Sequence, residues 1–104
     1  MEKLIIDYVD IALLSPHPAN ARRHPKKQID QIARSLRRFG FRLPILVTDG
    51  GTIVAGHGRV EAARKIGIDR IPVVCCDTLS AQEVRAYMIL DNRLAENADW
   101  DRDA

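Results

Sequence analysis

The stretch that decides the fold is "IVAGHGRVEAARKIG", residues 53–67, in which a β-branched run ends in glycine and a helical pattern follows. Gly56 closes the predicted strand, and Val60, Ala63 and Ile66 then recur at the spacing of one helical face. A strand that ends in glycine and leads into a helix leaves unpaired backbone N–H groups at the helix start, where an anion can approach closely. The stretch therefore predicts a turn that serves either the backbone alone or a phosphate.

Four residues of this turn, Gly56, His57, Gly58 and Arg59, are the first candidate site. Arg59 would lie in the first helical turn, where it could add a bidentate charge-assisted contact, and His57 could add a further donor. Glycines at strand-to-helix turns often serve only the backbone, so these residues leave both interpretations open.

The segments on either side predict a small α+β domain with a mixed sheet and three to four helices. The expected elements are an edge strand in residues 3–14, a helix in 28–39, a hairpin in 44–55, a helix in 58–66, a strand in 70–76 and a helix in 80–92. Pro25 and Gly40 are suited to the ends of the first helix and Gly67 to the end of the second, while Ser80 and Glu83 form a capping-box pattern at the third.

Length and composition predict one domain, because 104 residues that are 46% hydrophobic support a single modest core. The chain ends on an acidic run without a capping element, so we expect residues 1–104 to be the N-terminal part of a longer protein. No basic start precedes a long apolar run, which predicts a cytoplasmic protein without a membrane span. The adjacent Cys75 and Cys76 have neither zinc-knuckle nor redox-pair spacing.

The net charge of +2 is mild, but basic residues crowd the first predicted helix and its flanks. A basic face of this kind fits the phosphates of DNA, although a solvated helix face gives the same pattern. The candidate nucleic-acid contacts are Arg34, Arg37, Arg38 and Arg42.

Two further stretches carry polar groups that could meet a ligand. "HPANARRHP", residues 17–25, holds an extended loop that presents Asn20 and Arg22 before a helix. "LDNRLAEN", residues 90–97, contains two pairs of an acid and an amide, Asp91 with Asn92 and Glu96 with Asn97. Their side-chain oxygen atoms are ligands of the kind that magnesium prefers. Solvated loop charges and a helix end explain the same residues equally well.

The three stretches together resemble the ParB/sulfiredoxin superfamily, and in particular the N-terminal ParB-like domain that precedes DNA methyltransferases. "HPANAR" resembles the family's "NPxQPR" box, with Asn20 and Arg22 at its Gln and Arg positions. "GHGRVEA" resembles "GERRxRA" at Gly56 and Arg59, and "DNRLAEN" resembles "ENxQRED" at Asn92, with Asp91 in place of the acid. The order and spacing of the three boxes agree.

The resemblance implies a ParB/sulfiredoxin-like fold that binds CTP with magnesium. Residues 56–59 would take the phosphates with support from Arg22, and Asp91 with Asn92 would hold the metal. The family box has a second arginine where this chain has Gly58, and it has a basic residue where this chain has Glu61. These departures leave the identity of the nucleotide open between CTP and ATP. Sulfiredoxin carries its nucleophilic cysteine in the equivalent turn, where this chain has His57, so sulfinic acid reduction is not expected.

The expected function is that of a nucleotide-binding module in a DNA-associated protein. The expected partners are the nucleotide, DNA that is reached through the parent protein, and a second copy of the domain that pairs with the first when nucleotide binds. Slow nucleotide hydrolysis would fit this role, although the sequence designates no catalytic residue. A metal-dependent nuclease or a nucleotide-dependent kinase on the same fold is the first alternative, since fold alone does not fix function. A nonspecific DNA-binding module that uses the basic helix is the second.

Overall fold

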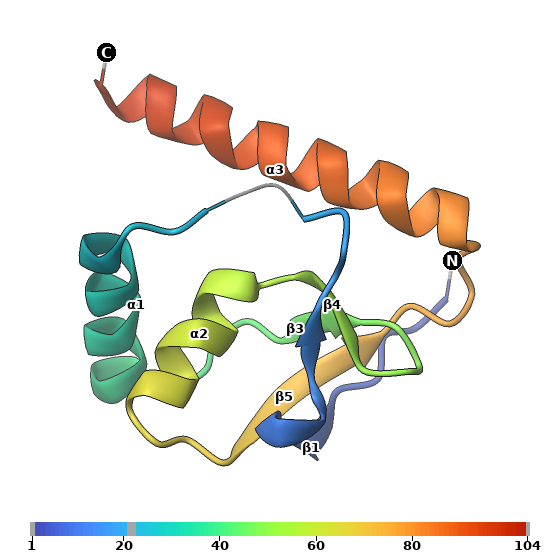
Figure 1. Ribbon diagram of the computed structural model, residues 1–104, viewed down its shortest axis with the longest axis horizontal. Coiled ribbons are helices and arrows are strands. Elements are labelled where there is room, and N and C mark those ends of the chain that lie inside the picture. Colours follow the sequence, from blue (N-terminus) through green and yellow to red (C-terminus); the bar gives the residue numbers. More distant parts are fainter. Residues whose placement is uncertain (1, 21–22, 104) are drawn as a thin grey trace.

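The computed structural model describes the backbone of residues 2–20 and 23–103 and the side chains of those residues up to position 94. In this part of the chain, three helices flank a five-stranded sheet (Figure 1). The helices are α1 (Lys26–Phe39), α2 (His57–Lys65) and α3 (Ala81–Asp103). The strands are β1 (Asp7–Asp10), β2 (Ser15–Pro16), β3 (Ile45–Val47), β4 (Thr52–Ala55) and β5 (Arg70–Cys75). The predicted α+β class with a mixed sheet and three helices is confirmed.

The sheet has the strand order β1-β5-β3-β4-β2 and mixes two kinds of pairing. β1 with β5 and β3 with β4 are antiparallel, whereas β3 with β5 and β2 with β4 are parallel. The two edge strands are joined by one short 3-10 turn, η1 (Ile11–Leu13), so the sheet is curled. Arg64 of α2 holds this turn, because its Nη2 donates to the carbonyl oxygens of Ile11 at 3.2 Å and Leu14 at 2.6 Å.

Apolar side chains on the two faces of the sheet build two cores. The larger core packs α1 and α2 against one face and includes Ile45, Ile53 and Ile71. The smaller core packs Val84 and Met88 of α3 against the other face. Ile53 lies in the first core and its neighbour Val54 in the second, as the alternation of side chains along a strand requires. The sheet therefore holds α2 and α3 on opposite sides of β4.

The limits of the helices and strands follow the sequence signals closely, with two differences. The capping box is formed, since the Glu83 N–H donates to Ser80 Oγ at 3.1 Å and the Ser80 N–H donates to Glu83 Oε1 at 2.9 Å. The edge strand expected in residues 3–14 is confined to β1, because the Asp10 carboxylate accepts the Ala12 N–H and starts η1. α3 continues beyond residue 92 because no proline or glycine follows to end it. Among the described residues, no helix is both long and apolar enough to cross a membrane.

Candidate functional site

A pocket of about 250 Å³ lies at the N-terminus of α2, where three distant parts of the chain meet. The loop before α1, the β4–α2 turn and α3 all contribute to it. Its lining residues are Asn20, His24, Ile32, Val54, Ala55, Gly56, His57, Gly58, Arg59, Asp91 and Asn92. The structure thus brings together the predicted residues of all three stretches that it describes. Arg22 and the side chains of Glu96 and Asn97 lie outside the described residues.

The backbone at the start of α2 has the form that an anion site needs. Gly56 is the N-cap, with a left-handed conformation (φ 101°, ψ 20°), and its carbonyl oxygen accepts the Val60 N–H at 3.0 Å as the first helical bond. Because Gly56 has no side chain to cap the helix, the N–H groups of the first turn remain available at the pocket. The helix dipole adds partial positive charge at the same place.

Gly58 has a packing role that the sequence did not reveal. A Cβ atom at this position would lie 3.1 Å from His24 Cε1 and 3.2 Å from Ile32 Cδ1. The glycine therefore lets α1 and the loop before it approach α2. This contact places His24 against the helix N-terminus, and the missing side chain keeps the pocket open.

Arg59 is fixed by the segment that leads into β3. Its Nη1 donates to the carbonyl oxygens of Leu43 at 2.7 Å and Pro44 at 3.3 Å. Burial lowers the pKa of Arg59, and the charge of Asp91, which lines the same pocket, acts in the opposite direction. One nitrogen of the guanidinium thus anchors the backbone, while Nε and Nη2 can serve a ligand.

His57 is held as a neutral ring in the same turn. The His17 backbone N–H donates to His57 Nε2 at 3.4 Å, which leaves the ring proton on Nδ1. Burial lowers the pKa of His57, and the positive charges that His24 and His17 can carry lower it further. His57 can therefore donate one hydrogen bond to a ligand without carrying a charge at neutral pH.

The lowered pKa of His57 predicts a pH dependence of folding. A folded-state pKa below the unfolded value of 6.5 means that the unfolded chain binds more protons near this pH, so stability must fall as the pH drops through and below 6.5. Chemical unfolding followed across this range should show the loss, and it should be smaller in His57→Gln, which cannot be protonated. Equal slopes in the two proteins would show that the folded-state pKa of His57 is not depressed.

Asp91 and Asn92 lie on α3 at the wall of the pocket opposite α2. They offer carboxylate and amide oxygens, and among the described residues no cluster of three or more His, Cys, Asp or Glu side chains is placed to hold a metal. Magnesium is commonly bound by one or two carboxylates together with phosphate oxygens and water. The two residues therefore suit a magnesium ion that arrives with a phosphate ligand.

His24 is the polar lining residue that the sequence analysis missed. Its Nδ1 pairs with Gln28 Oε1 at 3.0 Å, and its ring also lines an adjoining pocket of about 460 Å³ that shares Asn20 and His57. The available signal was the position of His24 in the "HPANARRHP" stretch, four residues before Gln28 on the first turn of α1. Only the packing against Gly58 shows that the side chain reaches the site.

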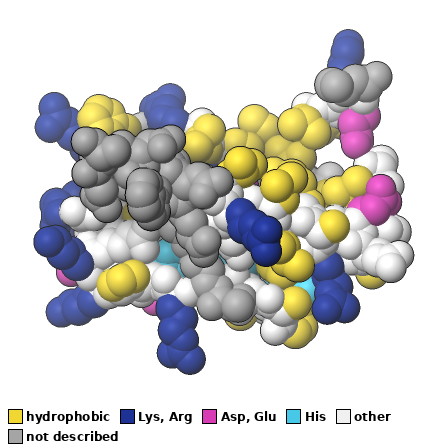
Figure 2. Space-filling view, turned by 90° about the horizontal axis from the view of Figure 1, so that it is seen from above, with side chains coloured by type: hydrophobic (Ala, Val, Ile, Leu, Met, Phe, Trp, Pro, Cys, Tyr) yellow, Lys and Arg dark blue, Asp and Glu magenta, His cyan; other side chains and the backbone are white. Residues whose placement is uncertain are grey.

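The predicted basic face is separate from this pocket. Arg34, Arg37 and Arg38 are exposed on α1, Arg42 is exposed just beyond it, and none of them lines the pocket. Figure 2 shows several Lys and Arg side chains projecting from the end of the molecule where α1 lies. Their role in binding nucleic acid remains a prediction.

Comparison with known proteins gives one consistent family. Residues 1–92 match the ParB N-terminal domain. The chain is 40% identical over 82 residues to the ParB-like nuclease domain-containing protein YnaK of Escherichia coli, an alignment that covers 79% of this chain and 94% of YnaK.

Two solved structures have a similar fold and a sequence identity to this chain above 25%. C-terminally truncated ParB from Caulobacter crescentus, complexed with CTP-γ-S, has a TM-score of 0.74 and 28% identity, covering 84% of this chain and 52% of that protein. Free serine kinase in complex with AMP has a TM-score of 0.61 and 26% identity, covering 77% of this chain and 34% of the kinase. The chain thus spans about half or less of these two proteins.

The family match covers the sheet, α1, α2 and the part of α3 that lines the pocket. The predicted membership of the ParB/sulfiredoxin superfamily is confirmed, whereas the predicted fusion to a methyltransferase remains a prediction. On the family match and the likeness to YnaK and ParB together, the chain belongs to the ParB N-terminal domain family.

Proposed function

We propose that this domain binds a nucleoside triphosphate, CTP or ATP, together with magnesium, in the pocket at the N-terminus of α2. The observation that carries the proposal is the meeting of the β4–α2 turn, with Gly56 and Arg59, and Asp91 of α3 in one pocket. The likeness to a ParB complexed with CTP-γ-S and to a kinase in complex with AMP supports it.

Each residue has a role that follows from its chemistry. The first-turn N–H groups of α2 would bind phosphate oxygens, with Arg59 Nη2 and His57 Nδ1–H as further donors. Asp91 and Asn92 would hold magnesium against those phosphates. Asn20 also lines the pocket, and its amide could contact the sugar or base. When bound, magnesium would neutralise phosphate charge, which is what slow hydrolysis would require.

The direct test is calorimetric titration of the domain with CTP, ATP, GTP and UTP, each with and without magnesium. We expect saturable binding of CTP or ATP that strengthens when magnesium is added. Binding of neither nucleotide at millimolar concentration, by a domain shown to be folded, would contradict the proposal. Equal binding of all four would show that the pocket reads phosphates alone.

Asp91→Asn should change the magnesium dependence in a characteristic direction. With magnesium present, affinity should fall about tenfold, the loss of about 1.4 kcal/mol, because a charged metal ligand becomes neutral. Without magnesium, affinity should stay constant or rise slightly, because a carboxylate that repels phosphate is gone. Asp69→Asn removes an exposed carboxylate that does not line the pocket and is the matched control. An equal loss with and without magnesium would contradict the metal role.

A second candidate function is nonspecific DNA binding by the basic face, which the exposure of Arg34, Arg37 and Arg38 favours. Replacing all three by alanine should weaken duplex binding and flatten its salt dependence, since each arginine that no longer neutralises a phosphate lowers the slope by about one unit. Nucleotide binding should be unchanged, because these residues do not line the pocket. If fluorescence anisotropy showed the same salt dependence of DNA affinity in the triple variant, this face would be excluded as the DNA-binding surface.

We further propose that the parent protein is DNA-associated and that nucleotide promotes pairing of two copies.

A further inference from the structure

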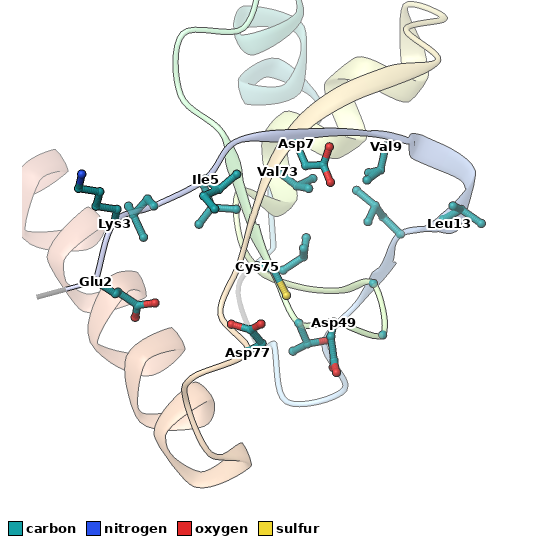
Figure 3. Close-up of a pocket in the computed structure, with 17 residues that line it drawn as sticks. Glu2, Lys3, Ile5, Asp7, Val9, Leu13, Asp49, Val73, Cys75 and Asp77 are labelled. Carbon is teal, nitrogen blue, oxygen red and sulfur yellow. The ribbon is translucent and has the colours of Figure 1, made fainter.

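A separate and larger groove, of about 700 Å³, lies away from the α2 pocket, between residues 2–5 and the C-terminal half of β5, and residues 13–14 and 47–51 also line it (Figure 3). We call it the edge slot. Its two sides are held together at both ends. At one end β1 pairs with β5 as far as Asp7 and Val73, and at the other Thr78 Oγ1 donates to Glu2 Oε1 at 2.8 Å. Between these ties the two segments diverge.

β5 has a strand partner on only one side along the slot. Val74 and Cys75 pair with β3, but the ladder with β1 ends before them. The Cys76 N–H donates to Val47 of β3 at 2.9 Å, and successive backbone N–H groups of a strand point to opposite sides, so the Cys75 N–H faces the slot. The slot therefore presents strand backbone that can accept another extended chain.

The slot is apolar inside. Its lining includes Leu14, Val47 and Val73, which belong to the larger core, so the groove opens directly onto that core. Across it, Leu4 and Ile5 are 71% and 80% exposed although they precede a paired strand. An apolar side chain that entered the slot would bury surface on both sides, at about 25 cal/mol for each Å² removed from water.

The rim of the slot is acidic. Four carboxylates, Glu2, Asp7, Asp49 and Asp77, line it, and Lys3 is the one basic residue among its lining. Figure 3 shows Asp49, Cys75 and Asp77 at the same side of the groove. Burial raises the pKa of the Cys75 thiol, and the charges of Asp77 and Asp49 raise it further.

We propose that the edge slot binds an extended peptide segment of a partner protein in which apolar residues alternate with lysine or arginine. The peptide adds a strand beside Val74 and Cys75, places its apolar side chains over the core, and pairs its basic side chains with the acidic rim. Alternation follows from the strand, because successive side chains point to opposite faces. The slot is independent of the α2 pocket, so this inference does not rest on the proposed nucleotide function.

The test uses a short end-blocked peptide of alternating lysine and valine, titrated into the isotope-labelled domain and followed by amide shifts. We expect saturable shifts in residues 3–7 and 73–77 and slower hydrogen exchange of the Cys75 amide. A peptide with glutamate in place of lysine should not bind, nor should one with serine in place of valine. Shifts that spread over the surface without saturation, or none in these two segments, would overturn the proposal.

The rim is tested by the double variant Asp49→Asn/Asp77→Asn, which should weaken binding of the lysine–valine peptide at least about fivefold. Its matched control, Glu61→Gln/Asp69→Asn, removes the same charge from exposed positions outside the slot and should bind as the unmodified domain does. Equal weakening in both variants would show that net charge, and not the slot, attracts the peptide. Peptide binding to a domain that fails to bind nucleotide would leave this inference standing while the proposed function fell.

Discussion

Replacement of Gly56 by alanine is expected to lower the free energy of unfolding by about 3 kcal/mol, from backbone strain of about 1–2 kcal/mol and overpacking of about 1–3 kcal/mol. The strain arises because φ at Gly56 is 101°, a conformation that L-residues rarely adopt. The overpacking arises because the added Cβ would lie 2.6 Å from Ile45 Cδ1, a side chain that is completely buried. Thermal and denaturant unfolding measure the change.

Gly67→Ala separates the two causes. Gly67 also has a positive φ, of 78°, but no atom lies within 4 Å of an added Cβ. Alanine there should cost only the backbone strain, about 1 kcal/mol. If both variants lost the same stability, the contact with Ile45 would contribute nothing. If Gly56→Ala retained full stability, the turn would not require glycine for folding, and its glycine would have to serve the ligand alone.

Local signals in the sequence were sufficient for most of the fold. The hairpin around the Asp49-Gly50-Gly51 turn, the glycines that end α1 and α2, and the capping box of Ser80 and Glu83 all depend on neighbours within a few residues, and all form as predicted. β2 was missed because Ser15 and Pro16 form a strand only through their pairing with β4, which lies far along the chain. Strand pairs of this kind leave no local pattern.

The candidate site could be predicted only in part, because its geometry depends on tertiary contacts. The resemblance to the ParB boxes named three stretches, but spacing alone could not show that Asp91 and Arg59 line one pocket or that His24 packs on Gly58. Nor could it show that Arg59 holds the carbonyl of Leu43. The edge slot has no motif at all, since it arises where the β1–β5 ladder ends early.

Arg59→Ala should produce the largest loss of nucleotide binding. A hydrogen bond to a charged group contributes about 1.5–3 kcal/mol, so removing the guanidinium should weaken nucleotide affinity about thirtyfold. The same change leaves the carbonyl oxygens of Leu43 and Pro44 without their donor and should reduce the free energy of unfolding by about 1–2 kcal/mol. Lower stability alone could mimic weaker binding, so calorimetry must be run on protein shown to be folded.

Arg64→Ala provides the control that makes the result decisive. Arg64 lies on the same helix and also donates to two backbone carbonyls, those of Ile11 and Leu14, but it lines only the adjoining pocket and not the one that contains Asp91. Its loss should cost similar stability and leave nucleotide affinity within about threefold of the unmodified domain. Equal losses of affinity in the two variants would mean that both arginines act through the scaffold. A loss confined to Arg59→Ala would place the phosphates at the N-terminus of α2.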